Sequence, residues 1–232
     1  MFFIGLATDY DGTLATDGQV GEDVLEGVRA FRRTERRVLL VTGRELPELR
    51  ACFPDLALFD RVIAENGAVL YEPATERKRI LAAAPPQSFV EALRSRGVSP
   101  LSVGDVIVAT REPQQNIVLD VIRELGLELQ IIFNKGAVMV LPPGVNKASG
   151  LLAALEELDM SAHNVVGVGD AENDHAFLQA CGCAVAVANA LPMLKSRADI
   201  VTGGARGAGV VEIMNRICKC DALLLPAGRR TT

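Results

Sequence analysis

Two carboxylates stand two positions apart near the start of the chain. Asp9 and Asp11 follow the apolar residues 2–8, and Gly12 and Thr13 come directly after them. Like charges at this spacing repel each other, so the pair requires a compensating partner such as a cation or a bound proton. Residues of this type suit acid–base chemistry or the binding of a metal ion.

Three further groups of polar residues follow apolar segments or begin a predicted helix. They are Asp170, Glu172, Asn173 and Asp174 after residues 164–169, Thr42, Gly43 and Arg44 after residues 37–41, and Lys147 near the start of residues 146–159. In an open α/β sheet, ligands bind outside the carboxyl ends of the parallel strands. We therefore expect these segments to converge with the first acidic pair at one edge of a sheet.

Such a constellation suits the binding of a cation and of a phosphoryl group. Carboxylate oxygens are ligands that Mg2+ prefers, and protein-bound Mg2+ often meets a substrate phosphate. A lysine, a threonine hydroxyl and backbone N–H groups of a turn suit the phosphoryl oxygens. Neutralised charge, fixed positions and a nucleophile are what phosphoryl transfer requires, so the residues favour this chemistry.

Other ligand-binding motifs do not fit the same residues. An EF-hand loop beginning at Asp9 would need glycine in its sixth and glutamate in its twelfth position, where Leu14 and Val20 stand. Residues 167–172 begin like a dinucleotide fingerprint, but Glu172 replaces the third glycine. The chain also lacks a G-x4-G-K-[ST] loop, which excludes a Walker-type nucleotide site.

The segments that must position these residues alternate between two patterns. Continuous apolar runs are typical of strands that are buried on both faces of a parallel sheet, and they cover residues 2–8, 37–42, 61–64, 164–169 and 183–188. Between them, amphipathic patterns predict helices over residues 22–33, 146–159 and 172–182. This alternation predicts the α/β class, with a doubly wound and mainly parallel sheet.

The middle of the chain has a different organisation. The charged, proline-bearing residues 72–86 and the sequence PPGVN at 142–146 are typical of domain junctions. Between them we expect two helices, a strand over residues 105–110 and a hairpin that turns at residues 134–136. The sequence therefore predicts a core of residues 1–78 and 144–232, with a small α+β module inserted over residues 79–143.

The bulk composition excludes several classes of protein. The 232 residues are 49% hydrophobic with a net charge of −5, which is a globular composition without the basic surface of a nucleic-acid binder. No apolar run approaches the roughly 20 residues of a membrane helix. The first residues lack a basic signal-peptide region, and five cysteines are an odd number, so we expect a cytoplasmic protein with idle thiols. We expect residues 220–232 to be a loosely held terminus.

Four motifs together resemble those of the haloacid dehalogenase superfamily. They are DYDGTL at residues 9–14, VTGR at 41–44, NK at 146–147 and GDAEND at 169–174, in the order typical of that superfamily. The sequence AENGA at 64–68 and the inserted module resemble the Cof-type, subfamily IIB branch with a C2 cap. The resemblance extends to about residue 217. It implies a Rossmann-like core, and the short cap is more similar to that of archaeal phosphoglycolate phosphatases than to those of bacterial sugar phosphatases.

The resemblance also implies roles for individual residues. Asp9 would be the nucleophile that forms an aspartyl-phosphate, and Asp11 would be the general acid and then the general base. The implied positions further comprise Thr42 and Lys147 at the phosphoryl group, Gly12, Thr13, Gly43, Arg44 and Asn66 toward the substrate, and Asp9, Asp11, Asp170, Asn173 and Asp174 at Mg2+.

Several of these residues have a structural alternative. Asp9 and Asp11 would then cap a turn, Thr42 with Gly43 would form an ordinary turn, and Lys147 would be a solvated helix start. The same holds for Asp174, Arg44 and Asn66. Asp174 would then fix its own loop, Arg44 would form a salt bridge, and Asn66 would hold its turn. The leading hypothesis is a Mg2+-dependent phosphatase that acts on a small phosphorylated metabolite. The alternatives are a phosphomutase, a receiver-type phospho-acceptor module and a catalytically inactive binding domain.

Overall fold

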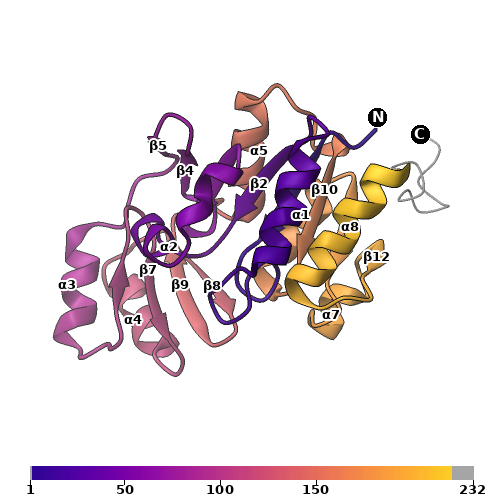
Figure 1. The fold of residues 1–232 in the computed structure, drawn as a ribbon. Coiled ribbons are helices and arrows are strands. Elements are labelled where there is room, and N and C mark those ends of the chain that lie inside the picture. The colour runs from indigo at the N-terminus through magenta and orange to yellow at the C-terminus, as the bar shows by residue number, and fades with distance from the viewer. Residues whose placement is uncertain (1, 221–232) are drawn as a thin grey trace.

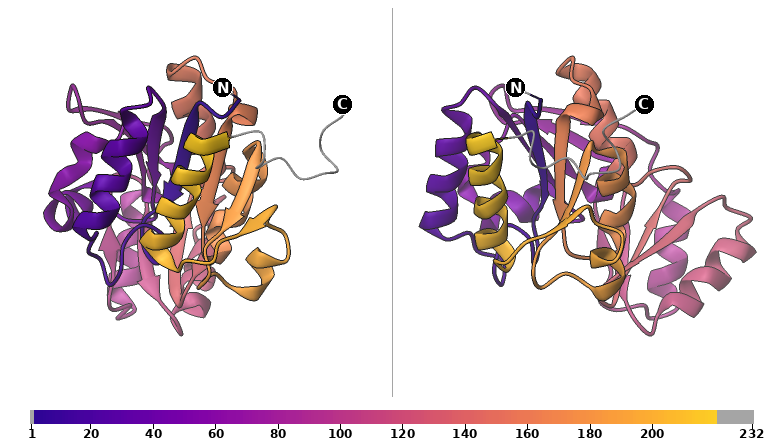
Figure 2. Two further views of the ribbon diagram at one scale, coloured as in Figure 1. Left: turned by 45° about the vertical axis from the view of Figure 1, so that its right-hand side comes forward. Right: turned by 90° about the vertical axis from the view of Figure 1, so that its right-hand side faces the viewer.

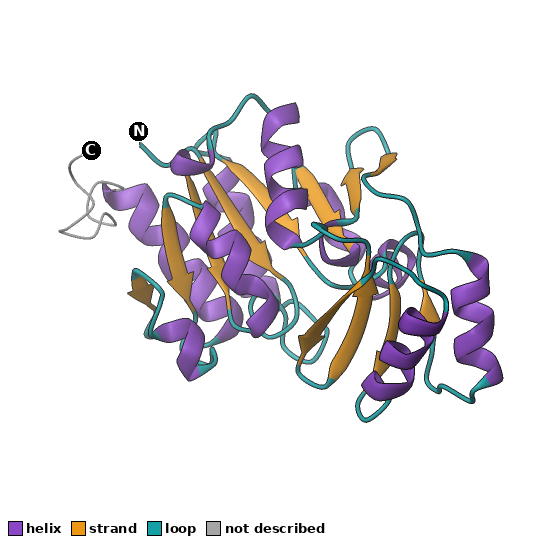
Figure 3. Cartoon of the chain, turned by 180° about the vertical axis from the view of Figure 1, so that it is seen from behind, coloured by secondary structure: helices purple, strands orange, loops and turns teal. Residues whose placement is uncertain are grey.

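The computed structural model describes residues 2–220 of the chain. Residue 1 and residues 221–232 lie outside this part, and with them nearly all of the terminus that we expect to be loosely held. The described residues form one eight-stranded and one four-stranded sheet, each covered by helices (Figures 1 and 3). Within residues 2–220, each helix is too short or too polar to cross a bilayer.

The larger sheet confirms the predicted α/β class. Its strand order is β12-β11-β10-β1-β2-β3-β4-β5, with parallel pairing from β12 to β3 and antiparallel pairing from β3 to β5. The strands are β1 (Gly5–Asp9), β2 (Arg37–Val41), β3 (Arg61–Ala64), β4 (Val69–Glu72), β5 (Arg77–Ile80), β10 (Val165–Gly169), β11 (Cys183–Ala186) and β12 (Ile200–Val201). Every residue of β1 and of β10 is buried, because helices cover both faces of the sheet.

Helices on both faces of this sheet provide that cover. They are α1 (Glu22–Arg32), α2 (Leu46–Cys52), α5 (Lys147–Glu157), α6 (His175–Ala180), α7 (Pro192–Lys195) and α8 (Arg206–Cys220). Helices α1 and α8 lie side by side on one face, and α5 and α6 lie on the other (Figure 2). The apolar stripe of α1 comprises Val24, Leu25, Val28 and Phe31, all of them buried. Burial of each such side chain stabilises the fold by about 1.5–3 kcal/mol.

The smaller sheet is antiparallel and has the order β6-β7-β9-β8. It contains β6 (Ser102–Val103), β7 (Val108–Arg111), β8 (Gln130–Asn134) and β9 (Ala137–Leu141), together with helices α3 (Gln87–Ser95) and α4 (Gln115–Glu124). Val108, Val138 and Val140 pack against these two helices in a separate hydrophobic cluster. The larger sheet extends through Ile80, two residues past the expected boundary at 78.

The buried carboxylate of Glu65 links the two sheets. Glu65, in the turn that follows β3, is fully buried and accepts the backbone N–H groups of residues 105–107 in the β6–β7 loop. The three N···O distances are 2.8, 2.7 and 2.8 Å. Gly104 leaves room for this contact, because a Cβ there would lie 2.6 Å from Oε1 of Glu65. The smaller sheet is thereby held over the carboxyl ends of the core strands.

Candidate active site

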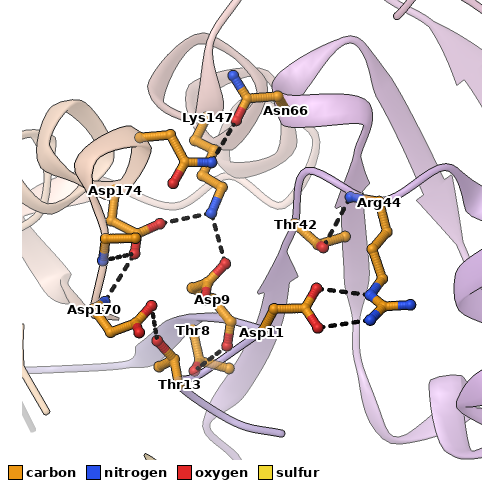
Figure 4. Close-up of polar contacts among 12 residues, drawn as sticks. Thr8, Asp9, Asp11, Thr13, Thr42, Arg44, Asn66, Lys147, Asp170 and Asp174 are labelled. Atoms are coloured by element: carbon orange, nitrogen blue, oxygen red, sulfur yellow. Dashed lines mark hydrogen bonds and ion pairs between the residues drawn. The ribbon is translucent and has the colours of Figure 1, made fainter. Parts of the chain in front are cut away.

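The predicted convergence of polar residues is present at the carboxyl ends of three neighbouring strands. Strand β1 pairs in parallel with both β10 and β2, so all three end at the same edge of the sheet. Asp9 ends β1, Asp170 follows β10 and Thr42 follows β2. Figure 4 shows these side chains around one space. Lys147 reaches the same space from the first residue of α5.

Lys147 holds two of the buried carboxylates. Its Nζ donates to Oδ1 of Asp9 and to Oδ1 of Asp174, each at 2.6 Å, and its side chain is 1% exposed. The side chain of Asn146 accepts hydrogen bonds from the N–H groups of Ala148 and Ser149 and so caps α5. This cap fixes the start of the helix, and with it the position of Lys147, its first residue. A lysine at this position opposes the helix dipole, and the two ion pairs offset that penalty.

Burial is the largest influence on the pKa of Asp9. The pKa of Asp9 is raised to about 7, first by burial and next by the charge of Asp174, while the charge of Lys147 opposes both. For Lys147, burial lowers the pKa, but the charges of Asp174 and Asp9 outweigh this and raise it above its usual value. The site therefore holds more negative charge than its lysine compensates, which favours the binding of a cation.

Asp174 fixes the loop that carries Asp170. Its Oδ2 accepts the backbone N–H groups of Asp170 at 2.8 Å and of Ala171 at 2.9 Å, while its Oδ1 accepts from Lys147. Gly169 permits this packing, since a Cβ there would lie 2.7 Å from the Asp174 side chain. The loop-fixing alternative for Asp174 is thus present in the structure, with both of its oxygens engaged.

The donor set fits a divalent cation. Carboxylate oxygens of Asp9, Asp170 and Asp174 lie within 4.8 Å of one another, and this is the one such cluster found among residues 2–220. The Nζ of Lys135 lies 2.6 Å from Oδ2 of Asp170 and 3.2 Å from the backbone carbonyl oxygen of Asp11. The ammonium group of Lys135 therefore lies against the acidic cluster and compensates part of its charge. Burial raises the pKa of Asp170, and the hydrogen bond from Lys135 opposes this.

Sequence reasoning did not identify Lys135 as a site residue. It stands in the β8–β9 turn of the inserted module, 124 positions from Asp11, and in the sequence NKG it gave a turn signal alone. Asn189 was missed as well: its Nδ2 donates to the carbonyl oxygen of Gly12 at 2.8 Å and lies 3.4 Å from Oδ2 of Asp170. No local motif surrounds either residue.

Asp11 faces away from Lys147 and pairs with Arg44 (Figure 4). The guanidinium Nε and Nη2 donate to the two carboxylate oxygens, both at 2.7 Å, and Nη1 donates to Glu48 at 2.7 Å. The guanidinium carbon also lies 5.4 Å from the centre of the Tyr10 ring. The salt bridge considered for Arg44 is therefore present. Thr42 lies beside it, 1% exposed, and its hydroxyl oxygen accepts the backbone N–H of Arg44.

The glycine and threonine after the acidic pair fit tightly against Asp170. Gly12 has φ +88°, a conformation that L side chains rarely adopt, and a Cβ there would lie 2.5 Å from Oδ2 of Asp170 and 2.7 Å from Nζ of Lys135. The Thr13 hydroxyl donates to Oδ1 of Asp170 at 3.3 Å. Both residues therefore shape the wall of the acidic cluster.

The buried side-chain amides of Asn173 and Asn66 form a hydrogen-bonded pair at the site. Nδ2 of Asn173 donates to Oδ1 of Asn66 at 2.9 Å, and the backbone N–H of Asn66 donates to the carbonyl oxygen of Thr42. Asn66 has φ +55°, as expected of a residue that holds a turn. Within the described part of the chain, Nδ2 of Asn66 and Oδ1 of Asn173 are buried without a hydrogen-bond partner. Both amides thus keep hydrogen-bonding capacity beside the site.

A cavity of about 470 Å3 lies between the core and the inserted module. Its core wall includes Asp9, Asp11, Gly43, Arg44, Glu45 and Glu48, and its other wall includes Ser102, Ile107, Ala109, Thr110, Arg111, Asn134, Lys135, Ala137 and Met139. An acidic strand edge whose oxygens fit a cation, facing a cavity beneath the inserted module, is an arrangement in which a phosphoryl group can be held and water excluded.

Comparison with known proteins identifies the class. The haloacid dehalogenase-like hydrolase family matches residues 6–117 and 101–214, and the chain belongs to this family. A phosphoglycolate phosphatase of Methanothermobacter thermautotrophicus is 34% identical over 222 residues, which cover 91% of this chain and 97% of that protein. Phosphoglycolate phosphatase 2 of Saccharolobus solfataricus is 32% identical over 91% of each chain. The chain is accordingly a phosphatase of this family.

Solved structures share the fold. The Thermoplasma acidophilum protein 0175 has a TM-score of 0.79 at 17% identity, covering 93% of this chain and 98% of that one. The sucrose-phosphatase of a Synechocystis species, solved with sucrose and phosphate, has a TM-score of 0.71 at 20% identity, covering 94% and 99%. A sugar phosphatase of HAD subclass IIB is also similar, with a TM-score of 0.75 at 19% identity over 92% and 98%. The predicted resemblance to the superfamily is confirmed by the family match, and these solved structures, one of them of subclass IIB, share the predicted fold.

Proposed function

We propose that this chain is a Mg2+-dependent phosphatase that hydrolyses a small phosphomonoester of the phosphoglycolate or sugar-phosphate type through an aspartyl-phosphate. The observation that carries the proposal is the position of Asp9, buried at the end of β1 between Lys147 and the Asp170 loop and lining the cavity. The names of the relatives support the substrate type.

Asp9 has one oxygen available to attack phosphorus. Lys147 engages Oδ1, and within residues 2–220 Oδ2 accepts no hydrogen bond. In the first step the bond from Asp9 to phosphorus forms, and the bond from phosphorus to the substrate oxygen breaks. Asp11 protonates that leaving oxygen, which requires its contact with Arg44 to loosen. Asp11 then takes a proton from the water that attacks phosphorus, so Asp9 and inorganic phosphate are released.

The metal would be held by Asp9, Asp170 and the backbone carbonyl of Asp11, the oxygens that Lys135 contacts in part here. Once bound, the ion supplies neutralisation of phosphoryl charge. Lys147 neutralises the charge of Asp9 and lies beside the phosphoryl position. The inserted module covers the cavity and keeps bulk water from the intermediate.

The proposal is tested by measuring phosphate release with Mg2+ and with EDTA, over a panel that includes 2-phosphoglycolate and several sugar phosphates. The wild type is compared with Asp9→Asn, which we expect to lose activity by about a thousandfold or more because the nucleophile is removed. Asp17→Asn is the matched control, since the Asp17 side chain is 89% exposed in the adjoining loop. Thermal unfolding verifies that both variants fold.

Each other outcome contradicts one part of the proposal. Full activity in Asp9→Asn would exclude Asp9 as the nucleophile. An isomerised phosphate ester as the main product would indicate a phosphomutase. A long-lived phosphoprotein without turnover would indicate a receiver-type module. Equal rates in Mg2+ and in EDTA would exclude the metal requirement.

A further inference from the structure

One face of the smaller sheet is turned toward the active site. Ala109 and Arg111 of β7 pair in register with Met139 and Ala137 of β9, so these four side chains share a face. The sulfur of Met139 lies 3.4 Å from where a Cβ on Gly43 would stand, which places this face against the core. All four residues line the cavity.

Arg111 is an uncompensated cation on that face. It is exposed, it lines the cavity, and within residues 2–220 its guanidinium has neither an ion pair nor a hydrogen-bond partner. The other two cations of the cavity wall are engaged: Arg44 with Asp11 and Lys135 with Asp170. A bound anion would therefore find an available partner in Arg111.

Asn134 stands beside this position. It pairs in register with Ala137 on β9, and Ala137 in turn pairs with Arg111 on β7. Its Oδ1 is buried without a hydrogen-bond partner among the described residues. The amide also lines the cavity, so it keeps hydrogen-bonding capacity for a ligand or its bound water.

The remaining polar groups of this wall are engaged within the protein. The Thr110 hydroxyl donates to the carbonyl oxygen of Pro100 at 2.6 Å, and the Ser102 hydroxyl donates to Glu45 of the core. A polyhydroxyl sugar would need many donors and acceptors, and few are left for it here. An exposed guanidinium without a partner among the described residues instead suits a carboxylate, to which it can donate two parallel hydrogen bonds.

We propose that Arg111, with Asn134 beside it, forms a subsite for a carboxylate of the substrate, and that the substrate is the phosphate ester of a short hydroxy acid. This inference rests on the proposed function and deepens it, because it selects an acid over a sugar. The phosphoryl group lies at Asp9, and Arg111 binds the opposite end of the molecule from the other wall of the cavity.

The test compares two esters that differ in the carboxylate alone. 2-Phosphoglycolate and 2-hydroxyethyl phosphate have nearly the same size, and kcat and KM are measured for both with Mg2+. We expect the wild type to favour the acid, and Arg111→Gln to lose about 10- to 100-fold in kcat/KM for the acid, mainly through KM. In Arg111→Gln, kcat/KM for the neutral ester should fall much less. Arg111→Lys keeps the charge but lacks the planar guanidinium. Its kcat/KM for the acid should lie between those of the wild type and Arg111→Gln.

Arg123→Gln is the matched control, because Arg123 is an exposed arginine of the same module on α4. This variant should have the same kcat/KM as the wild type for both esters. If the wild type hydrolyses both esters equally, or if Arg111→Gln lowers both equally, the carboxylate subsite is excluded while the phosphatase proposal stands. If neither ester nor p-nitrophenyl phosphate is hydrolysed, the proposed function fails, and the subsite fails with it.

Discussion

Lys147 carries its charge in the interior of the protein, where an unpaired ammonium would be very unfavourable. Its two contacts at 2.6 Å bring Asp9 and Asp174 to one Nζ, although Asp9 ends β1 and Asp174 lies in the segment that follows β10. The ring of Phe177 adds a further contact, with its centre 5.9 Å from Nζ. The lysine therefore assembles the site and also holds together the two segments that supply the acids.

Replacing Lys147 should damage both stability and activity. Lys147→Met removes the cation and leaves two buried carboxylates uncompensated, so we expect the free energy of unfolding to fall by about 3–5 kcal/mol. Urea unfolding measures this. Lys219→Met is the control, since Lys219 is exposed on α8. Unchanged stability in Lys147→Met would contradict the buried ion pairs, and retained phosphatase activity would contradict the proposed role of the lysine at the phosphoryl group.

At the scale of elements, the position of the β6–β7 loop depends on Glu65. The carboxylate accepts three successive backbone N–H groups, which are then satisfied without water. The same loop is linked to β5 by Lys78, whose Nζ lies 2.8 Å from both carboxylate oxygens of Asp105. These contacts set how the smaller sheet lies over the cavity, and therefore where Arg111 and Lys135 stand.

We predict that Glu65→Ala loosens this loop. Three buried N–H groups lose their acceptor, and each unsatisfied group costs about 1–3 kcal/mol before water enters. Hydrogen exchange of the amides of residues 105–107 should accelerate by about tenfold or more. Glu65→Gln keeps one acceptor oxygen and should show a smaller effect. Glu128→Ala, at an exposed position of the same module, is the control. Unchanged exchange at these amides in Glu65→Ala would show that the loop is held by other contacts.

At the scale of the whole molecule, the interior carries an excess of negative charge at one edge of its main sheet. Asp9, Asp170 and Asp174 face two ammonium groups, those of Lys147 and Lys135. A divalent cation that binds the folded state alone would relieve this excess and shift the unfolding equilibrium toward the native protein. Stability should therefore depend on the metal as well as on the core.

We predict that Mg2+ raises the unfolding temperature relative to EDTA. At a concentration of 100 times its dissociation constant, the stabilisation is about 2.7 kcal/mol. For a chain of this size that corresponds to about 5–10 °C. Asp170→Asn removes one charge of the cluster and should reduce the response strongly, whereas Asp17→Asn should respond like the wild type. No shift in the wild type would argue against a metal site at these carboxylates.

The sequence by itself determined the class of fold and the polar groups at its edge. Apolar runs such as residues 164–169 are short, continuous and bounded by polar residues, so each predicts a buried strand locally. Because neighbouring parallel strands end at the same edge, the positions of Asp9, Thr42 and Asp170 followed from the alternation of elements.

The tertiary structure alone decided which side chains touch. Lys135 and Glu65 make contacts across the boundary between the two sheets, and Arg111 lines the cavity between them. All three positions depend on how the inserted module docks. That docking results from many contacts between residues far apart in sequence. Neither the period of a strand or helix, 2.0 or 3.6 residues, nor a short motif predicts such contacts. The pairing of Asp11 with Arg44, and not with the buried lysine, was also decided by the tertiary structure, in this case within the core.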